Sequence, residues 1–311
     1  MTVTWDDDLD AIFAGDLTVA LGYRTPAGGV VVQAVAPIGL RDREQGTLGF
    51  TTSLGFSKKL ERIAADPRVA MAFHAREHGR ATATRYVLAQ GTARVVQQPS
   101  DAIRELIRTQ AAVYLGPARE GFFWDRWLRE YYVSRVPVEV TVTRIVTWPT
   151  LDAAGPAGAV HGAPLPPVPA EPQRPPKNGS GPRIDVARAA KRLRGTAHTL
   201  LGYAGADGMP VVVPVELGAD DERGLTLRSA TPLAPGGRRA GLLGHSYRRQ
   251  LIGLETRQHT GWLEVADDGA ARYAPHTETG YQAPPNKTLL LLLNGALAKK
   301  GVRQAARKAR R

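Results

Sequence analysis

Hydroxyl and ammonium groups gather in one short stretch, "FTTSLGFSKKLERIAADPRVAMAF", at residues 50–73. An apolar run ends in three hydroxyl residues, and after a glycine turn a serine and two lysines begin a helical pattern. These residues are Thr51, Thr52, Ser53, Ser57, Lys58 and Lys59. The first turn of a helix offers unpaired N–H groups and the positive end of the helix dipole. Hydroxyls, amides and cations that converge there favour an anion, and a phosphate group is the best match. The alternative is an ordinary helix cap followed by two solvated lysines.

The elements around this stretch are mostly strands. The segments "VVVQAVAPI", "TLGFTTS", "RVAMAFHA", "RYVLAQGTARVV" and "VPVEVTVTRIVTW" are apolar, short and separated by turn residues, which predicts strands. Two helical stretches interrupt them, one from Ser57 and one from Ser100 to Tyr114. A strand meander with few helices over residues 1–150 predicts a closed or partly closed antiparallel barrel.

The second half of the chain repeats this order of elements. Leu21-Gly22-Tyr23 recurs as Leu201-Gly202-Tyr203, and a glycine turn and a valine-rich strand follow each triplet. A helical stretch precedes both triplets, and a further strand with paired basic residues comes after both. We therefore predict a tandem duplication. A proline-rich segment between the halves predicts an extended linker.

Composition narrows the class of protein. There are no cysteines, which excludes disulfides, thiolate nucleophiles and cysteine-ligated zinc and suits a cytoplasmic protein. We expect no membrane segment, because no apolar run is long enough, and no signal peptide, because the N-terminus is acidic. The formal charge is +12, of which +7 lies in Lys299–Arg311. That basic end is either a solvated tail or a nucleic-acid contact.

Other chemistries find little support in the sequence. No glycine-rich dinucleotide fingerprint, Walker loop or nucleophile elbow is present. His74 and His78 are four residues apart, but they fall in a strand end and loop, so we predict no metal site.

The ordered set of segments resembles the pyridoxamine 5′-phosphate oxidase-like family of flavin- and deazaflavin-binding split barrels. The segments that carry the likeness are "VALGYRTPAGGVVVQAVAPIGL", "GFTTSLGFSKKLERIAADPRVAMAF", "VLAQGTARVV" and "DRWLREYYVSRVPVEVTVTRIVTW". It covers residues 8–150 clearly and 185–285 more faintly. We accordingly predict an α+β protein, mainly β, with two tandem split β-barrel domains. The predicted parts are a cofactor-binding barrel (1–152), a Pro-rich linker (153–184), a second, divergent barrel (185–290) and a basic C-terminal tail (291–311).

The resemblance implies that flavin mononucleotide, or the deazaflavin F420, lies across a barrel face with its phosphate at the hydroxyl and lysine corner. Lys59 matches the more consistent family position of the two lysines. A second barrel would complete the site, either in a homodimer or as an intramolecular pair, and Trp124, Trp127, Tyr131 or the second half of this chain are candidates for that role. The same aromatic cluster is also typical of a core. The predicted cofactor-binding residues are Gln33, Val35, Pro37, Thr51, Thr52, Ser53, Ser57, Lys58, Lys59 and Trp127.

The implied function is a flavin- or deazaflavin-dependent oxidoreductase that transfers hydride to or from a small organic substrate. The cofactor performs the redox chemistry, so we assign no catalytic side chain. The arginine stretch with which pyridoxine-phosphate oxidases bind substrate has no counterpart, and we do not expect vitamin B6 oxidation. The second half lacks the Thr-Thr-Ser run and can have kept only a pairing role. Two alternatives stay open: a non-catalytic flavin or haem carrier, with a histidine on the haem iron, and a duplicated barrel whose tail binds nucleic acid.

Overall fold

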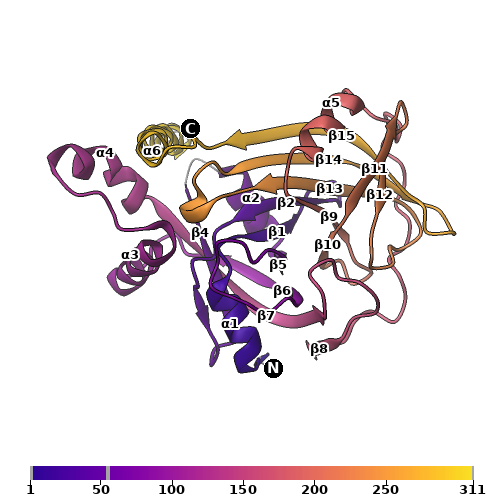
Figure 1. Ribbon diagram of the computed structural model, residues 1–311, viewed down its shortest axis with the longest axis horizontal. Helices are drawn as coiled ribbons and strands as arrows, with labels where there is room; N and C mark the ends of the chain where they lie inside the picture. Colours follow the sequence, from indigo (N-terminus) through magenta and orange to yellow (C-terminus); the bar gives the residue numbers. More distant parts are fainter. Residues whose placement is uncertain (1–2, 54–56, 310–311) are drawn as a thin grey trace.

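A computed structural model describes residues 3–53 and 57–309. Two β-sheets make up most of the molecule (Figure 1). The first sheet contains β1 (Val19–Arg24), β2 (Val30–Val35), β3 (Arg41–Asp42), β4 (Thr47–Ser53), β5 (Arg68–Phe73), β6 (Tyr86–Val95), β7 (Arg135–Trp148) and β8 (Ala159–Gly162). The second contains β9 (His198–Ala204), β10 (Pro210–Pro214), β11 (Glu216–Asp221), β12 (Gly224–Arg228), β13 (Gly236–Ser246), β14 (Glu255–Val265) and β15 (Ala271–Gln282). The predicted α+β class, rich in strands, is confirmed.

The two sheets have the same strand order. It is β2-β1-β5-β6-β7-β4-β3 in the first and β10-β9-β13-β14-β15-β12-β11 in the second, and β8 pairs with β7. Each sheet also has a register shift at the matching place, at Gly91 in β6 and at Gly261 in β14. A Cβ on Gly91 would lie 2.1 Å from the Thr141 carbonyl oxygen, and one on Gly261 would lie 2.2 Å from that of Ala274. Only glycine fits at either bulge, because the facing backbone leaves no room for a side chain.

The repeated Leu-Gly-Tyr triplets lie where the two sheets meet. A Cβ on Gly22 in β1 would lie 2.7 Å from Cγ2 of Val212 in the second sheet. A Cβ on Gly202 in β9 would lie 2.3 Å from Cγ2 of Val32 in the first. The missing side chain of each glycine therefore leaves room for a valine of the other sheet: Val212 packs on Gly22, and Val32 packs on Gly202. This explains why both triplets carry glycine in the middle of a buried strand.

Alternation along the strands separates three hydrophobic cores. Leu21 and Tyr23 point into the core of the first sheet, with Phe50, whereas Ala20 points into a core between the sheets. That middle core also contains residues of the second sheet, such as Leu243. A third core lies inside the second sheet. Period-2 alternation thus buries both faces of the strands at the junction.

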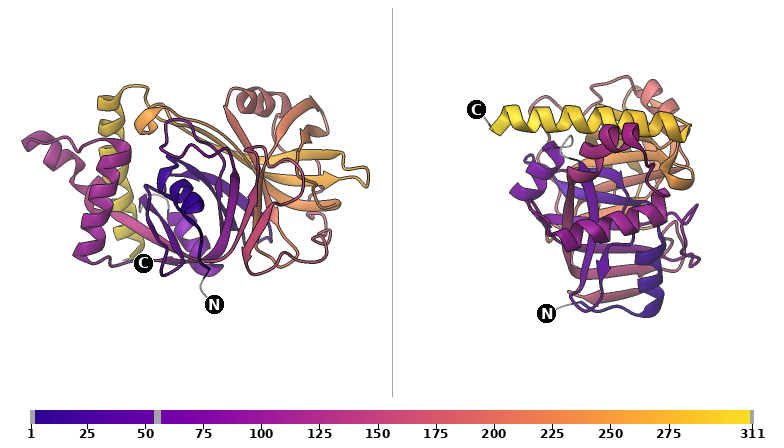
Figure 2. Two further views of the ribbon diagram at one scale, coloured as in Figure 1. Left: turned by 60° about the horizontal axis from the view of Figure 1, so that its bottom comes forward. Right: turned by 90° about the vertical axis from the view of Figure 1, so that its left-hand side faces the viewer.

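The helices are α1 (Asp7–Gly15), α2 (Ser57–Ala65), α3 (Asp101–Leu115), α4 (Phe122–Val133), α5 (Val186–Arg194) and α6 (Lys287–Ala309), with a 3₁₀ turn η2 at Arg249–Leu251. As predicted, Ser100 caps α3, and its Oγ accepts from the Ile103 N–H at 3.3 Å. Helices α3, α4 and α6 gather at one end of the molecule, on the opposite side from α5 (Figures 1 and 2). None of the described helices is long and apolar enough to cross a membrane.

Two segments differ from their prediction. Residues 291–309, predicted as a basic tail, belong to α6, a helix of 23 residues that packs on α4. The run of leucines at its start supplies a packing face that the charge count did not reveal. The proline-rich segment contains β8 and lies against both sheets, since Gln173 Nε2 donates to the Gly28 carbonyl and its backbone N–H to that of Gly237.

Candidate functional site

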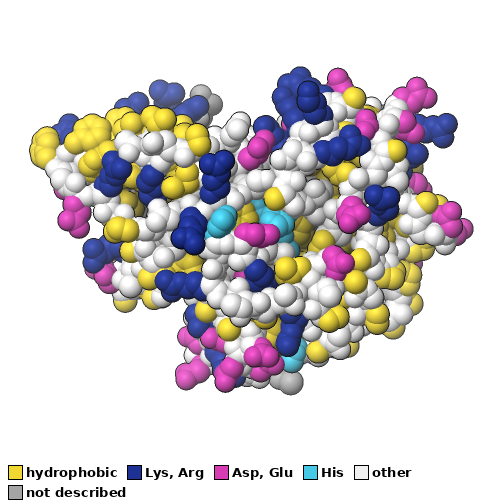
Figure 3. Space-filling view, viewed as in Figure 1, with side chains coloured by type: hydrophobic (Ala, Val, Ile, Leu, Met, Phe, Trp, Pro, Cys, Tyr) yellow, Lys and Arg dark blue, Asp and Glu magenta, His cyan; other side chains and the backbone are white. Residues whose placement is uncertain are grey.

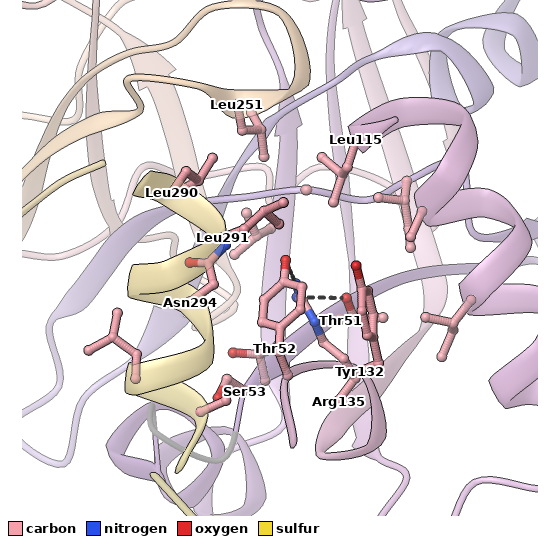
Figure 4. Close-up of a pocket in the computed structure, with 18 of the residues that line it drawn as sticks. Thr51, Thr52, Ser53, Leu115, Tyr132, Arg135, Leu251, Leu290, Leu291 and Asn294 are labelled. Atoms are coloured by element: carbon pink, nitrogen blue, oxygen red, sulfur yellow. Dashed lines mark hydrogen bonds between the residues drawn. The ribbon is translucent and has the colours of Figure 1, made fainter. Parts of the chain in front are cut away.

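A cavity of about 1290 Å³ opens between the two sheets and the helices α3 and α6 (Figure 4). Strands β2, β4 and β7 of the first sheet and β14 and β15 of the second contribute to its wall. Small-molecule sites usually measure about 300–1,000 Å³. The cavity is therefore large enough for a cofactor and a second molecule.

One corner of the cavity is polar and cationic. The end of β4 brings Thr51 there, and Arg135 at the start of β7 donates from Nη1 to Thr51 Oγ1 at 3.3 Å (Figure 4). The same guanidinium donates from Nη2 to the Tyr131 hydroxyl and lies 4.4 Å from the centroid of that ring. Strand register explains the meeting, because Ser53 pairs with Arg135 across β4 and β7.

Lys59 brings a second cation into this corner from the first turn of α2. Its side chain is 7% exposed, and its Nζ lies 5.7 Å from the centroid of the Phe50 ring. Burial, reinforced by the nearby charge of Arg135, lowers the pKa of Lys59 to about 7. A lysine with so low a pKa is destabilised in its charged form, and an anion beside it would relieve that penalty.

The second sheet supplies the facing wall. Gln33 Nε2 in β2 donates to Gln258 Oε1 in β14 at 2.8 Å, so the two halves are joined at the cavity itself. Thr256 and Tyr281 line the same wall. An amide pair and a hydroxyl beside a large cavity can hydrogen-bond the polar edge of a flat ring system.

The structure brings six of the ten predicted residues to the cavity: Gln33, Val35, Thr51, Thr52, Ser53 and Lys59. Pro37 is buried between two cavity-lining neighbours and does not itself line the space, and Lys58 is exposed to solvent away from it. Trp127 packs between helices, where its Nε1 donates to the Leu292 carbonyl and Lys299 Nζ lies 4.0 Å from its ring centroid. Ser57 begins α2, but its side chain lies outside the described residues.

Arg135 is a cavity residue that the sequence did not reveal. It opens a predicted strand, next to the predicted aromatic helix, and nothing in its local pattern indicates a ligand. Only the pairing of β4 with β7 brings its guanidinium to Thr51, 84 residues earlier in the chain. Arg135 and Lys59 together indicate an anion site at Thr51–Ser53 more strongly than Lys58 and Lys59 do in the sequence.

Apolar side chains dominate the part of the cavity between α3 and α6, although charged residues such as Arg104, Arg108 and Lys287 also line it. Leucines from α3, α6 and the η2 region point into the space opposite the polar corner, and the labelled ones in Figure 4 are Leu115, Leu251, Leu290 and Leu291. The cavity therefore has two chemically different halves, a cationic corner and an apolar compartment between α3 and α6.

A cluster of histidines lies elsewhere, at the junction of the sheets. His74 Nδ1 donates to the Ala72 carbonyl at 3.0 Å, so its Nε2 accepts from His245 Nε2 at 2.7 Å. His198 Nε2 lies 3.2 Å from Glu77 Oε2. Burial lowers the pKa of His74 to about 3 and that of His245 well below its usual value. Among the described residues, no group of three or more His, Asp or Glu is arranged to hold a metal. None of the described histidines lines the cavity.

Comparison with known proteins gives partial similarities. No family model matches the sequence. No curated protein matches it either. Solved structures similar to it include a conserved hypothetical protein of Mycobacterium tuberculosis, 21% identical, with a TM-score of 0.36 over 47% of this chain and 86% of that one. Another is an F420 reductase, 22% identical, with a TM-score of 0.32 over 44% of this chain and 94% of that one.

A third similar structure is a pyridoxamine 5′-phosphate oxidase-related, FMN-binding protein of Nostoc punctiforme. It is 7% identical, with a TM-score of 0.31 over 67% of this chain and 91% of that one. The predicted resemblance is thus confirmed as a similarity to solved structures whose descriptions name that family and F420. At these TM-scores, any functional case has to come from the residues of the chain itself.

Proposed function

We propose that this chain binds flavin mononucleotide or F420 in the cavity and transfers hydride between that cofactor and a small organic substrate. The observation that carries the proposal is the pair of cations, Lys59 and Arg135, converging on the hydroxyls of Thr51–Ser53 in a mostly buried corner. Both cofactors carry a phosphate, and a phosphate oxygen accepts charge-assisted hydrogen bonds from such groups. When bound, the cofactor would supply the redox chemistry, and the side chains would bind and orient it.

The corner that Thr51, Lys59 and Arg135 form is more consistent with a bound anion than with two solvated lysines. A phosphate between the ammonium of Lys59 and the guanidinium of Arg135 would offset the repulsion between these two charges. The hydroxyl of Thr51 already accepts from Arg135 and keeps its own proton for an oxygen of the ligand. On the facing wall, the Gln33–Gln258 pair offers donors and acceptors to the ring system.

We also propose that the two halves arose by tandem duplication and pair within one chain, as two subunits pair in a symmetric dimer. Identical strand order, matching bulges at Gly91 and Gly261, and the reciprocal packing of Gly22 and Gly202 support this. An isologous interface has this reciprocity, since each patch contacts its own copy. The Pro-rich segment at 153–184 would be the connection between the copies.

The pairing implies one cofactor per chain. In the second copy Val213 takes the place of Gln33, because each pairs with the leucine of its triplet. Leu88 takes the place of Gln258, since each lies three residues before its bulge glycine. Val213 and Leu88 are almost fully buried. The counterpart of the polar wall is therefore apolar and closed.

The test is the cofactor itself. Protein purified from cells should be coloured, and mass spectrometry of the released molecule should give flavin mononucleotide or F420 in a ratio near one per chain. Lys59→Ala should weaken its affinity by roughly 1.5–3 kcal/mol, the scale of a hydrogen bond to a charged group. Lys58→Ala, at the exposed neighbour, is the matched control and should leave affinity unchanged.

Three results would count against the proposal. A colourless protein that binds neither compound on titration would refute cofactor binding. A protein that holds one of them but never exchanges electrons with any donor or acceptor would be a carrier and not an enzyme. Equal losses in the Lys58 and Lys59 variants would place the phosphate elsewhere.

A further inference from the structure

Helices α3 and α6 line the apolar part of the cavity, and no side chain of residues 3–53 and 57–309 fills the space between them. Helix α3 carries apolar residues at helical spacing, yet none of its residues is buried. An amphipathic helix in a soluble domain normally covers a core with its apolar stripe. Here part of that stripe lines the cavity, together with residues of α6 and η2. The lining residues that define this compartment are Ile107, Ala111, Leu115, Leu251, Leu290 and Leu291.

Contacts at one end of α3 hold this wall in place. The Tyr114 hydroxyl donates to the Ala14 carbonyl, and Lys287 Nζ donates to the Leu115 carbonyl. The second bond joins the end of α3 to the start of α6, at one end of the compartment. An open space between two helices whose ends are tied together is typical of a pre-formed binding site.

We propose that this compartment binds the apolar body of an amphipathic substrate, a long alkyl chain or a fused hydrocarbon ring system, whose polar, reacting end points toward the Gln33–Gln258 wall. The binding claim stands on the compartment alone, and the claim that the bound molecule is a redox substrate rests on the proposed function. A cofactor phosphate at Lys59 would occupy the opposite end of the cavity. Charged residues of α3 and α6, such as Arg104, Arg108 and Lys287, also line the cavity. Asn294 and Gln250 are two uncharged lining residues that would meet a substrate hydroxyl or carbonyl.

Direct binding of a neutral fluorescent probe tests the compartment. N-phenyl-1-naphthylamine carries no charge, so it does not compete for the cations of the corner. The full-length protein should bind it, and straight-chain alcohols should displace it with an affinity that rises roughly fourfold for each added methylene until the compartment is full. Displacement that does not depend on chain length would overturn the proposal.

Matched variants on α3 locate the probe. Ile107→Trp should fill the compartment and weaken probe binding by roughly tenfold. Leu106→Trp changes the neighbouring residue, which is 50% exposed and does not line the cavity, and should leave binding unchanged. Because no residue of α3 is buried, neither change should unfold the protein, and thermal melting checks this. Equal effects at the two positions, or none at Ile107, would overturn the proposal.

Three further outcomes separate this proposal from the proposed function and from a dimer interface. Lys59→Ala should keep full probe binding while losing cofactor, so a protein that binds the probe but no cofactor refutes the proposed function and leaves the compartment assigned. A protein that binds cofactor but not the probe refutes the compartment alone. Light scattering that shows a dimer, with the probe excluded until the dimer dissociates, would assign the apolar faces to a second copy of this chain and overturn the proposal.

Discussion

Replacing Lys59 with methionine should stabilise the cofactor-free protein while weakening cofactor binding. Methionine fills a similar volume without a charge, so the change isolates the ammonium. Burial holds the pKa of Lys59 at about 7, against 10.5 for a solvated lysine. Each pH unit between these values is worth about 1.4 kcal/mol, so the buried charge destabilises the fold by up to about 5 kcal/mol.

The sign follows from proton binding. Between pH 7 and 10.5 the unfolded chain keeps the Lys59 proton and the folded chain releases it. Stability therefore falls as pH decreases through that range and is flat below it. Lys59→Met should remove this slope, giving a gain of about 3 kcal/mol at pH 8 and of up to about 5 kcal/mol at pH 6. The contact of Lys59 with the Phe50 ring offsets about 1 kcal/mol of it.

Urea unfolding of the cofactor-free protein, followed from pH 6 to pH 10, measures the effect. Lys58→Met, at an exposed lysine one residue away, is the control and should follow the wild type at every pH. Adding cofactor should reverse the order, because a phosphate restores the charge of Lys59 and the methionine variant cannot use it. If Lys59→Met is no more stable than Lys58→Met at pH 6, the ammonium is solvated and the reasoning about the corner fails.

Three more predictions test other parts of the structure. Arg135→Ala should weaken cofactor binding by roughly 1.5–3 kcal/mol in a fluorescence titration, and an unchanged affinity would remove Arg135 from the site. Burial lowers the pKa of His245 and keeps its side chain neutral, so the folded protein should lose stability as pH falls below 6.5. His245→Phe should reduce that loss in thermal melts between pH 7 and pH 4, and an identical pH dependence would contradict the buried neutral pair. Gly91→Ala and Gly261→Ala should each destabilise by roughly 2–4 kcal/mol in urea unfolding, whereas Gly181→Ala, which meets no atom within 4 Å, should be neutral; a tolerated alanine at either bulge would refute the close backbone approach.

The sequence predicted what local pattern controls. Alternating apolar residues and glycine turns gave the hairpins at Leu21 and Leu201, and the cap at Ser100 gave the start of α3. The hydroxyl triplet and Lys59 reach one cavity because they lie on a strand and on the helix that follows it. In each case the side chains that define the feature are close in the chain.

What the sequence missed depends on contacts between distant segments. Arg135 joins Thr51 only through strand pairing, and Gln258 meets Gln33 only because the two sheets pack together. The C-terminal segment was judged by its charge, yet leucines at its start give it a face that packs on α4 and lines the cavity. Trp127 was expected at the cofactor, but α6 covers it instead, and that helix was not predicted.

Pairing within one chain changes what substitution can do. In a homodimer every substitution alters both equivalent sites, because symmetry copies it. Here Gln33 and Val213 hold equivalent places in the two hairpins, and one place is polar and open while the other is buried. The second half can then serve as a wall of the cavity. Its strand β14 carries Gln258, which contacts Gln33 of the first half there. The large cavity, with its cationic corner and apolar compartment, therefore lies on the open side of two halves that share one strand order.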